Sequence, residues 1–541
     1  MNDAHILAPD KAKTVAYTDA DAMIASFGSI LFPDGASIPT PVTDAPEHFR
    51  DLNLDQIVAS VTAGREEYDL AAFFQTPLAE EVSIRYRQAV MRDLDVAANT
   101  VVFTAFAKAM RTMREQRQQA AKLYYEQQKR RWLLHAAQTY CDAVEALRKG
   151  MIPLALTSSG LTGLRDFIIA YADSPGFQRL RGRVAQLVAD LATIRYNVVI
   201  GDGGFRVFLY DGEADYSADV AETFAKFRQG DARDYRVRFH DAKEMNHIEA
   251  KILEFVALLQ PEIFGRLARF AADDADFAHN DLVRFDREVQ FYFAYLEHVA
   301  VLRRAGLSFC LPEIAVGTKE IHDEDGFDLA LAAKLVTANR PVVTNSFRLS
   351  GKERIIVISG PNQGGKTTLA RSFGQMHHLA AIGCPVPGTS ARLFLFDAVY
   401  THFEREENLQ NLRGKLQDDL MRIHAILSRA TPRSIVIMNE IFNSTALRDA
   451  VFLGHKVIER IIDLDLLCVC VTFLEELTAM SDSIVSMVST VNPVQPAERT
   501  FRVIRRPADG NAYASSIAEK YHLTRAWLSR RLTAPAGGGS R

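Results

Sequence analysis

The residues from Gly360 to Thr367 have the types and spacing of a phosphate-binding loop. Four apolar residues precede them, and Gly-Pro-Asn-Gln-Gly-Gly-Lys-Thr then leads into a run of helical character. Glycines allow backbone N–H groups to turn towards phosphate oxygens, and the start of the helix adds partial positive charge. Lys366 would contact the β- and γ-phosphates, and the Thr367 hydroxyl would bind Mg²⁺. The pattern predicts a site for ATP and Mg²⁺ rather than an ordinary glycine turn before a helix.

A second segment with the right residue types for this chemistry ends at Asn439 and Glu440. The apolar residues 435–438 before it predict a buried strand. A carboxylate at the end of such a strand often holds Mg²⁺, and a following glutamate can orient or deprotonate the attacking water. Glu440 is therefore the candidate catalytic residue, and Asn439 joins Thr367 as a candidate metal residue. Asn439 lacks a negative charge, so we expect Mg²⁺ to be held less firmly; the alternative is a core strand with a polar end.

The segment from Gly360 to Thr368 resembles the P-loop of the MutS family of mismatch-repair ATPases. Asn439–Asp449, Val471–Thr478 and Ala512–Ala518 resemble further segments of that family's ATPase domain, and Arg340–Asn345 resembles the stretch that packs on adenine. The resemblance implies a set of nucleotide-binding residues: Gly360, Pro361, Asn362, Gly364, Gly365, Lys366, Thr367, Thr368, Val342, Asn345 and Lys415. Lys415 belongs to the segment that, in the family, completes the nucleotide site of a second subunit.

The sequence also departs from the family pattern. Only about 45 residues precede the helical core, and the Phe-x-Glu wedge of mismatch-recognising members is not seen. The family's aspartate is Asn439, its histidine is Phe473, and its signature serine is Gly414, followed by Lys415. We therefore expect nucleotide binding with slow hydrolysis and without mismatch recognition of the family's usual kind.

The hydrophobic periodicity predicts a mixed fold, with a long α-helical region, a small β insertion and a C-terminal α/β domain that carries the P-loop. The resemblance implies that the helical region is a core and lever, that the β insertion is a reduced clamp, and that the C-terminal domain is an ATPase domain. The expected divisions are an N-terminal arm at 1–45, the helical region at 46–327 with a reduced clamp-like β insertion at 196–239, the ATPase domain at 328–532 and a disordered tail at 533–541. Short apolar runs predict the strands of the ATPase domain at 354–359, 435–439, 466–472, 483–489 and 500–505.

Two segments of the helical region carry more specific expectations. Glycines 201, 203 and 204 between apolar runs predict a β-hairpin over 196–210, to which Tyr235–Phe239 could add a third strand. The polar segment 114–134 predicts one extended, exposed helix. Its cluster Lys129-Arg130-Arg131 could touch phosphate, although a solvated helix face is the preferred interpretation.

The length, charge and cysteine content of the chain limit which functions are compatible with it. The chain has 541 residues, a net charge of −4 and 24% charged residues, so any DNA contact must come from a local basic face. Its five cysteines form no CxxC pair, which argues against a zinc site or a disulfide framework. No signal peptide or membrane-spanning run is recognised, and the expected location is cytoplasmic.

These observations favour an ATP-binding, slowly hydrolysing DNA-binding protein of repair or recombination. Its expected partners are ATP or ADP, double-stranded or branched DNA and a second copy of the chain, with no membrane. The alternative is a nucleotide-gated protein scaffold with little or no ATPase activity and no DNA binding. A small-molecule kinase fits poorly, because the helical half shows no acceptor site.

Overall fold

The computed structural model describes residues 27–36, 39–40, 45–201, 203–212, 245–404, 414–492 and 499–508, together with Arg525 and Trp527. The chain forms two compact units. Unit 1 comprises Met1–Phe27, Ala97–Leu156 and Leu161–Asp286, and unit 2 comprises Gly28–Val96, Thr157–Gly160 and Arg287–Arg541. The predicted tail and the first part of the predicted arm lie outside the described residues. Among the described residues, no helix is long and apolar enough to cross a membrane.

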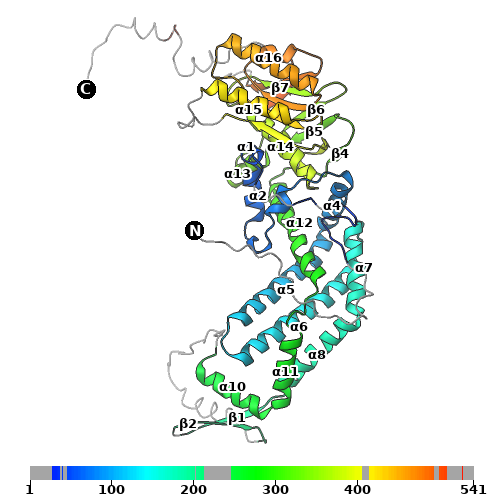
Figure 1. Cartoon of the computed structure of the whole chain (residues 1–541), viewed down its shortest axis with the longest axis vertical. Coiled ribbons are helices and arrows are strands. Elements are labelled where there is room, and N and C mark those ends of the chain that lie inside the picture. The colour runs from blue at the N-terminus through cyan, green and yellow to red at the C-terminus, as the bar shows by residue number, and fades with distance from the viewer. Residues whose placement is uncertain are drawn as a thin grey trace, which may run out of the picture. The chain divides into compact units, whose positions relative to one another are not determined.

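Unit 1 is built mainly from helices that share an apolar core. Its helices are α5 (Ala97–Lys122), α6 (Glu126–Met151), α7 (Ser159–Asp173), α8 (Pro175–Ala192), α10 (His247–Leu259) and α11 (Pro261–Asp273). Helices α5 and α6 lie side by side (Figure 1). Phe103, Phe106 and Met110 of α5 and Tyr140 of α6 are among the buried residues. These positions recur at helical spacing, which is why the sequence pattern indicated helix here.

The prediction of one extended helix over 114–134 is wrong. Helix α5 ends at Lys122, and α6 begins at Glu126 after a short connection. Some of the polar side chains that suggested a single exposed helix are also packed inside: Gln116 is buried and accepts a 2.9 Å hydrogen bond from Thr139 of α6. Ala120, Leu123 and Leu134 are buried where the two helices meet, so burying these residues favours a reversal of the chain over a continuous helix.

The predicted β-hairpin over 196–210 is confirmed. Strand β1 (Tyr196–Gly201) pairs antiparallel with β2 (Gly204–Leu209), and Gly201 is opposite Gly204 at the turn. Gly203 in this turn has a φ of +92°, a conformation that glycine adopts without strain. The possible third strand, Tyr235–Phe239, lies outside the described residues.

Unit 2 contains a six-stranded sheet that carries all five predicted strands. Their bounds are β7 (Ile355–Ser359), β11 (Ile435–Asn439), β12 (Leu467–Val471), β13 (Ile484–Val491) and β14 (Arg499–Arg505). The sheet order is β10-β11-β12-β7-β13-β14, where β10 (Val399–His402) was not predicted because it is short and partly polar. The strands from β10 to β13 run parallel, and β14 runs antiparallel to β13.

Helices and smaller sheets surround this sheet within unit 2 (Figure 1). A four-stranded sheet has the order β4-β9-β5-β6, and β3 pairs with β8. The bounds of these strands are β3 (Phe309–Cys310), β4 (Glu313–Ala315), β5 (Ile321–Gly326), β6 (Asn345–Leu349), β8 (Val386–Pro387) and β9 (Ser390–Phe394). The C-terminal part of the unit adds α13 (Leu329–Thr337), α14 (Lys366–Ala381), α15 (Lys415–Arg429), α16 (Leu447–Asp463) and the short 3₁₀ helix η2 (Glu475–Ala479).

The N-terminal part of unit 2 is helical. It contains α1 (His48–Asp51), α2 (Leu54–Thr62), the 3₁₀ helix η1 (Glu66–Tyr68), α3 (Ala71–Gln75) and α4 (Glu81–Leu94). Helix α1 contacts β10, and the Arg371 guanidinium of α14 donates a 2.9 Å hydrogen bond to the carbonyl of Asp51. The described parts of the chain therefore combine helices with several sheets, as the predicted mixed fold class requires.

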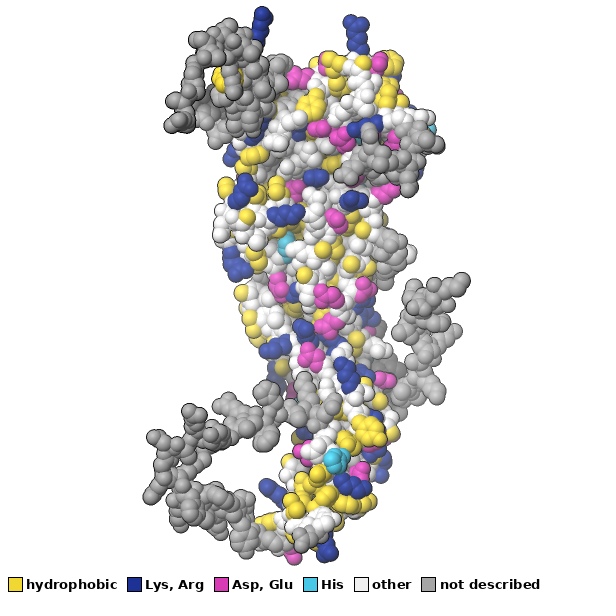
Figure 2. Space-filling model, turned by 90° about the vertical axis from the view of Figure 1, so that its left-hand side faces the viewer, with side chains coloured by type: hydrophobic (Ala, Val, Ile, Leu, Met, Phe, Trp, Pro, Cys, Tyr) yellow, Lys and Arg dark blue, Asp and Glu magenta, His cyan; other side chains and the backbone are white. Residues whose placement is uncertain are grey.

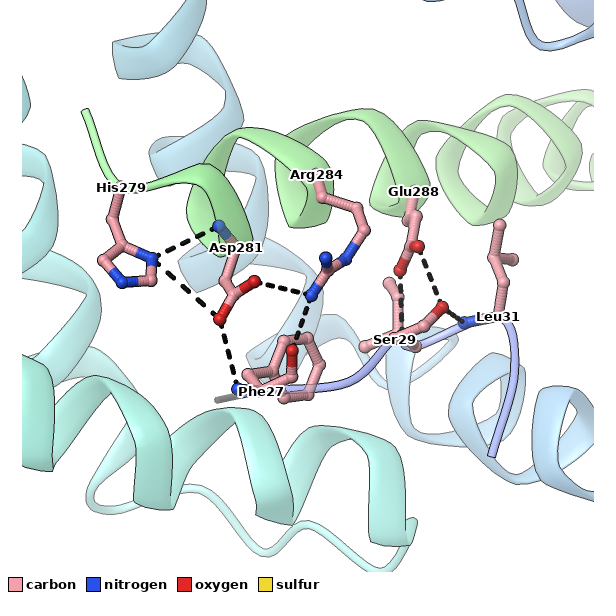
Figure 3. Close-up of polar contacts among 8 residues, drawn as sticks. Phe27, Ser29, Leu31, His279, Asp281, Arg284 and Glu288 are labelled. Carbon is pink, nitrogen blue, oxygen red and sulfur yellow. Dashed lines mark hydrogen bonds and ion pairs between the residues drawn. The ribbon is translucent and has the colours of Figure 1, made fainter. Parts of the chain in front are cut away.

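The described residues at the beginning of the chain are held by α12 (Asn280–Arg304), in which the division between the units falls. In unit 1, the Phe27 N–H donates to Asp281 at 3.2 Å, and Arg284 donates to the Phe27 carbonyl at 2.5 Å (Figure 3). In unit 2, the Ser29 hydroxyl donates to Glu288 at 2.8 Å. This part of the predicted arm is therefore packed on a helix.

Candidate nucleotide-binding site

The strand order brings three chemically informative segments to one edge of the six-stranded sheet. Strands β11, β12 and β7 are parallel neighbours, so their carboxyl ends lie at the same edge. Glu440 follows β11, Phe473 follows β12 after one residue, and Gly360 follows β7. Open α/β sheets bind their ligands at such carboxyl ends. The fold therefore brings together the loop after β7 and the end of β11, which are the two segments that the sequence predicts for phosphate chemistry.

The glycines of the loop after β7 are required by both backbone conformation and packing. Gly360 and Gly365 have φ values of +111° and +93°, which side chains rarely tolerate. A Cβ atom on Gly364 would lie 2.4 Å from the Ser489 hydroxyl, and one on Gly365 would lie 3.1 Å from the Phe501 carbonyl oxygen. The loop therefore packs its backbone directly against β13 and β14, and larger residues do not fit at these positions.

Lys366 is the first residue of α14, and its side chain folds back onto the loop. Its ammonium donates to the carbonyls of Gly360 at 2.9 Å and Pro361 at 3.1 Å, and to the Asn362 amide oxygen at 3.4 Å. Burial lowers the pKa of Lys366 to about 8, while the charge of Glu440 acts in the opposite direction. These oxygen partners are uncharged, so an incoming phosphate would offer the buried ammonium a stronger contact.

The two candidate metal residues are in direct contact. The Thr367 hydroxyl donates to the Asn439 amide oxygen at 2.9 Å, which joins the start of α14 to the end of β11. Hydroxyl and amide oxygens are ligands that Mg²⁺ accepts, and Mg²⁺ in nucleotide sites takes much of its coordination from phosphates and water. The residues present therefore fit a Mg²⁺ ion that arrives with a nucleotide, without a protein carboxylate at position 439.

Glu440, the candidate catalytic residue, sits on a constrained backbone beside this pair. Its φ is +58°, and its N–H donates to the Val471 carbonyl of β12 at 2.8 Å. Its carboxylate accepts a 3.2 Å hydrogen bond from the Asn443 side chain. A non-glycine residue in this region of backbone space is held there by its surroundings, and such residues concentrate at functional sites.

Phe473 occupies the position at which the resemblance placed a histidine, and it contacts the phosphate-loop lysine. Its ring centre lies 4.3 Å from the Lys366 ammonium, and 44% of the residue is exposed. The preceding Thr472 is buried, and its hydroxyl accepts a hydrogen bond from the Leu474 N–H at 3.0 Å. The segment after β12 therefore presents an aromatic face to Lys366.

Among the other predicted nucleotide-binding residues, Asn345 already has two partners. Its side chain donates to the Phe501 carbonyl at 3.1 Å and accepts from the Val503 N–H at 2.7 Å, which fastens β6 to β14. Val342 is half-buried in the segment before β6, and Thr368 is half-buried in the first turn of α14. An adenine contact by Val342 or Asn345 stays a prediction.

Lys415 has a carboxylate partner within its own chain. It is the first residue of α15, and its ammonium forms an ion pair with Glu404, which follows β10. Its predicted contact with the nucleotide of a second subunit stays a prediction.

Sequence reasoning missed the contribution of β13 and β14 to the site. Ser489 is fully buried, and its hydroxyl has no hydrogen-bond partner among the described residues although it lies against the glycines of the loop. The positive charge of Arg499 contributes to lowering the pKa of Lys366. The strands themselves were recognisable from their apolar runs, but no local signal showed that their hairpin lies against the loop. A buried, unpartnered hydroxyl beside a glycine loop fits a site that takes a polar ligand.

Comparison with known proteins finds a match to one protein family in the same region. The family model of MutS domain V matches residues 356–523. The DNA mismatch repair protein MutS of Chlorobaculum tepidum is 28% identical over 215 residues, which are 39% of this chain and 24% of that protein. The Desulfovibrio desulfuricans protein of that name is 37% identical over 117 residues, or 22% of this chain and 13% of its own length.

A third relative extends the similarity towards the helical half. The DNA mismatch repair protein MutS of Orientia tsutsugamushi is 24% identical over 316 residues, which are 57% of this chain and 34% of that protein. The matched segments thus span about a third or less of the relatives' own lengths.

Proposed function

Because the chain belongs to the MutS family, we propose that it binds Mg²⁺-ATP at the loop from Gly360 to Thr367 and hydrolyses it slowly. The observation that carries this proposal is the meeting of Lys366 and Thr367 with Asn439 and Glu440 at one edge of the sheet. Lys366 lies 2.9 Å from the Gly360 carbonyl, and Thr367 lies 2.9 Å from Asn439. A cation, a hydroxyl, an amide and a carboxylate at the start of a helix form the donor and acceptor set that phosphoryl transfer requires.

Each residue of this set has a separate task. The N–H groups of the loop and the first turn of α14 would bind phosphate oxygens, and Lys366 would exchange its neutral partners for them. Thr367 and Asn439 would hold Mg²⁺, which neutralises phosphate charge when bound. Glu440 would orient the attacking water and accept its proton. Asn439 supplies no charge and Phe473 no imidazole, so transition-state stabilisation should be weak and turnover slow.

We propose further that unit 1 contacts double-stranded or branched DNA and that the chain acts in DNA repair or recombination without mismatch recognition of the family's usual kind. The name of the relatives, DNA mismatch repair protein MutS, supports the choice of partner. Acidic and basic side chains are interspersed on the face shown in Figure 2. DNA affinity would therefore come from a few local cations, and it should fall steeply with salt.

A nucleotide-gated scaffold that binds protein in place of DNA is the second candidate. It is favoured by the ion pairs of unit 1, in which cations are neutralised by acidic neighbours. Examples are Arg117 with Asp276 at 3.0 Å and Lys129 with Glu126 at 2.8 Å. A cation with an acidic partner has less free charge to offer a phosphate backbone.

A binding assay separates the two candidates. Homoduplex, mismatched and branched DNA would be titrated with the full chain, with and without Mg²⁺-ATP, across a salt series. The DNA-binding proposal predicts saturable binding at low salt, a response to ATP and no preference for the mismatch. Arg130→Ala combined with Arg131→Ala should weaken binding equally for all duplex sequences if these cations touch phosphates. Absence of binding to every DNA at low salt would favour the scaffold.

A further inference from the structure

The contact between Phe473 and Lys366 has no role in the proposed reaction as described so far. Phe473 follows β12, and β12 lies between β11 and β7 in the sheet. The ring therefore follows the middle one of three strands. Glu440 follows β11 on one side, and the loop that begins at Gly360 follows β7 on the other. In a hydrolysing site, the terminal phosphate lies between the lysine of the loop and the water that the glutamate orients. The ring thus lies against the lysine that would contact the terminal phosphate.

The attraction between the Phe473 ring and the Lys366 ammonium is of the same kind as that between a phosphate and an ammonium, but it is weaker. The face of an aromatic ring carries partial negative charge and attracts an ammonium within about 6 Å of its centre. The Lys366 ammonium lies 4.3 Å from the centre of the Phe473 ring, and Lys366 is only 4% exposed. The oxygen partners of the buried lysine are uncharged, so the ring face adds its partial negative charge to the charge of Glu440 that also acts on this ammonium.

We propose that Phe473 determines which nucleotide this site prefers, because its ring takes the place of a terminal phosphate beside Lys366. A nucleoside triphosphate must displace the ring to place its terminal phosphate between Lys366 and Glu440. A nucleoside diphosphate ends one phosphate earlier and can bind with the ring in place. The chain is thereby biased towards the diphosphate-bound state. This inference rests on the proposed nucleotide-binding function of the same site and adds its ligand preference.

The test compares the affinities for ADP and for a non-hydrolysable ATP analogue, both with Mg²⁺, by calorimetry on the full chain without DNA. Phe473→Ala removes the ring from a partly exposed position, so the fold should tolerate it. A cation–π contact of the usual strength corresponds to a change of about 3-fold to 30-fold in affinity. We expect tighter binding of the analogue by about that factor, with less than about a twofold change for ADP.

Two further variants make the result specific. Phe473→Leu keeps apolar volume but lacks the negative ring face, so it should also tighten binding of the analogue. Phe208→Ala removes a ring of matched exposure, 46%, from β2 in unit 1, and both affinities should stay at their wild-type values.

The outcomes separate this inference from the proposed function. The wild-type chain could bind ADP while Phe473→Ala and Phe473→Leu keep the wild-type ratio of the two affinities. In that case the proposal that the Phe473 ring takes the place of a terminal phosphate is wrong, and the proposal of nucleotide binding stands. An equal gain for ADP and the analogue would overturn it in the same way. A wild-type chain that binds neither nucleotide would overturn both the inference and the proposed function.

Discussion

Asn439 and Glu440 decide, at the scale of single residues, how fast the proposed reaction can run. The Thr367 hydroxyl donates to the Asn439 amide oxygen at 2.9 Å, and in the proposed site this amide would hold Mg²⁺ less firmly than a carboxylate. Glu440 is the only carboxylate of the candidate set, and its backbone is held at a φ of +58°. In the proposed site, metal binding and water activation would thus be divided between a neutral and a charged side chain.

We expect Glu440→Gln to lower the rate of ATP hydrolysis by about a hundredfold or more, because the amide cannot accept the proton of the attacking water. Asn439→Asp should raise the rate, because it adds a negative charge at the metal position. Release of inorganic phosphate at saturating Mg²⁺-ATP measures both. If the Glu440→Gln chain releases phosphate as fast as the wild type, the assignment of Glu440 is wrong.

Helix α14 joins the phosphate loop to the interior of unit 2 and carries buried histidines. Its His377 and His378 are almost fully buried, and burial lowers the pKa of each to about 4. The ring nitrogens reach the carbonyls of Phe373 at 2.8 Å and Phe74 at 2.7 Å. Both rings are therefore neutral in the folded protein over the range in which they become protonated in the unfolded chain.

This burial predicts how stability depends on pH. In the unfolded chain, each histidine takes up a proton near pH 6.5, whereas the folded protein resists this down to about pH 4. The free energy of unfolding should therefore fall as the pH drops from 6.5 towards 4, by about 2 kcal/mol per histidine between pH 7 and pH 5.

Urea denaturation at the two pH values measures this change. His377→Gln should reduce the pH dependence, while His424→Gln, at an exposed position of α15, should leave it unaltered. An unchanged pH dependence in the His377→Gln chain would contradict the assignment of a buried neutral ring.

The sequence predicted five strands of the six-stranded sheet from short runs rich in apolar residues, and the central ones are almost wholly apolar. Ile355–Ser359 and Leu467–Val471 are buried at every position, as strands covered on both faces must be. Strand β10 and the sheet β4-β9-β5-β6 escaped prediction because their strands are short and mix polar with apolar residues. The prediction for residues 114–134 was wrong because polar residues at helical spacing give the same sequence pattern in one long helix and in two paired helices.

The candidate site was predictable only in part, because sequence patterns show local motifs but not contacts between distant segments. Gly360–Thr367 and Asn439–Glu440 are local motifs, and parallel pairing brings them together. The packing of Ser489 and Phe501 against the loop glycines depends on how a distant hairpin folds back. Likewise, only the folded chain shows that the Phe473 ring faces Lys366. Contacts between residues far apart in sequence leave no periodic signal.

Assembly with a second copy is the proposal that belongs to the whole molecule. The resemblance to the MutS family implies that the segment Gly414–Asp419 completes the nucleotide site of a second copy, and Lys415 is its cation. In the single chain Lys415 pairs with Glu404. The ion pair is partly exposed, with 32% of the Lys415 side chain and 47% of the Glu404 side chain accessible. Replacing Glu404 with a phosphate bound to a second copy would therefore cost little free energy.

We expect ATP with Mg²⁺ to tighten a dimer more than ADP does, because a contact between Lys415 and the partner's nucleotide couples occupancy to association. Lys415→Ala should erase the difference between the two nucleotides. Sedimentation velocity at several protein concentrations measures it. A chain that stays monomeric at high concentration with Mg²⁺-ATP would exclude a shared site.

Binding of Mg²⁺-ATP to the wild-type chain and to Lys366→Ala, measured by calorimetry, tests the central claim most directly. Lys366 lies 2.9 Å from the Gly360 carbonyl at the centre of the loop, and a charge-assisted contact from it is worth about 1.5–3 kcal/mol. The account predicts that affinity falls by at least about tenfold in the variant. Lys456→Ala, which removes an exposed lysine of α16 paired with Glu459, should bind ATP like the wild type. Unchanged ATP affinity in the Lys366→Ala chain would contradict the account.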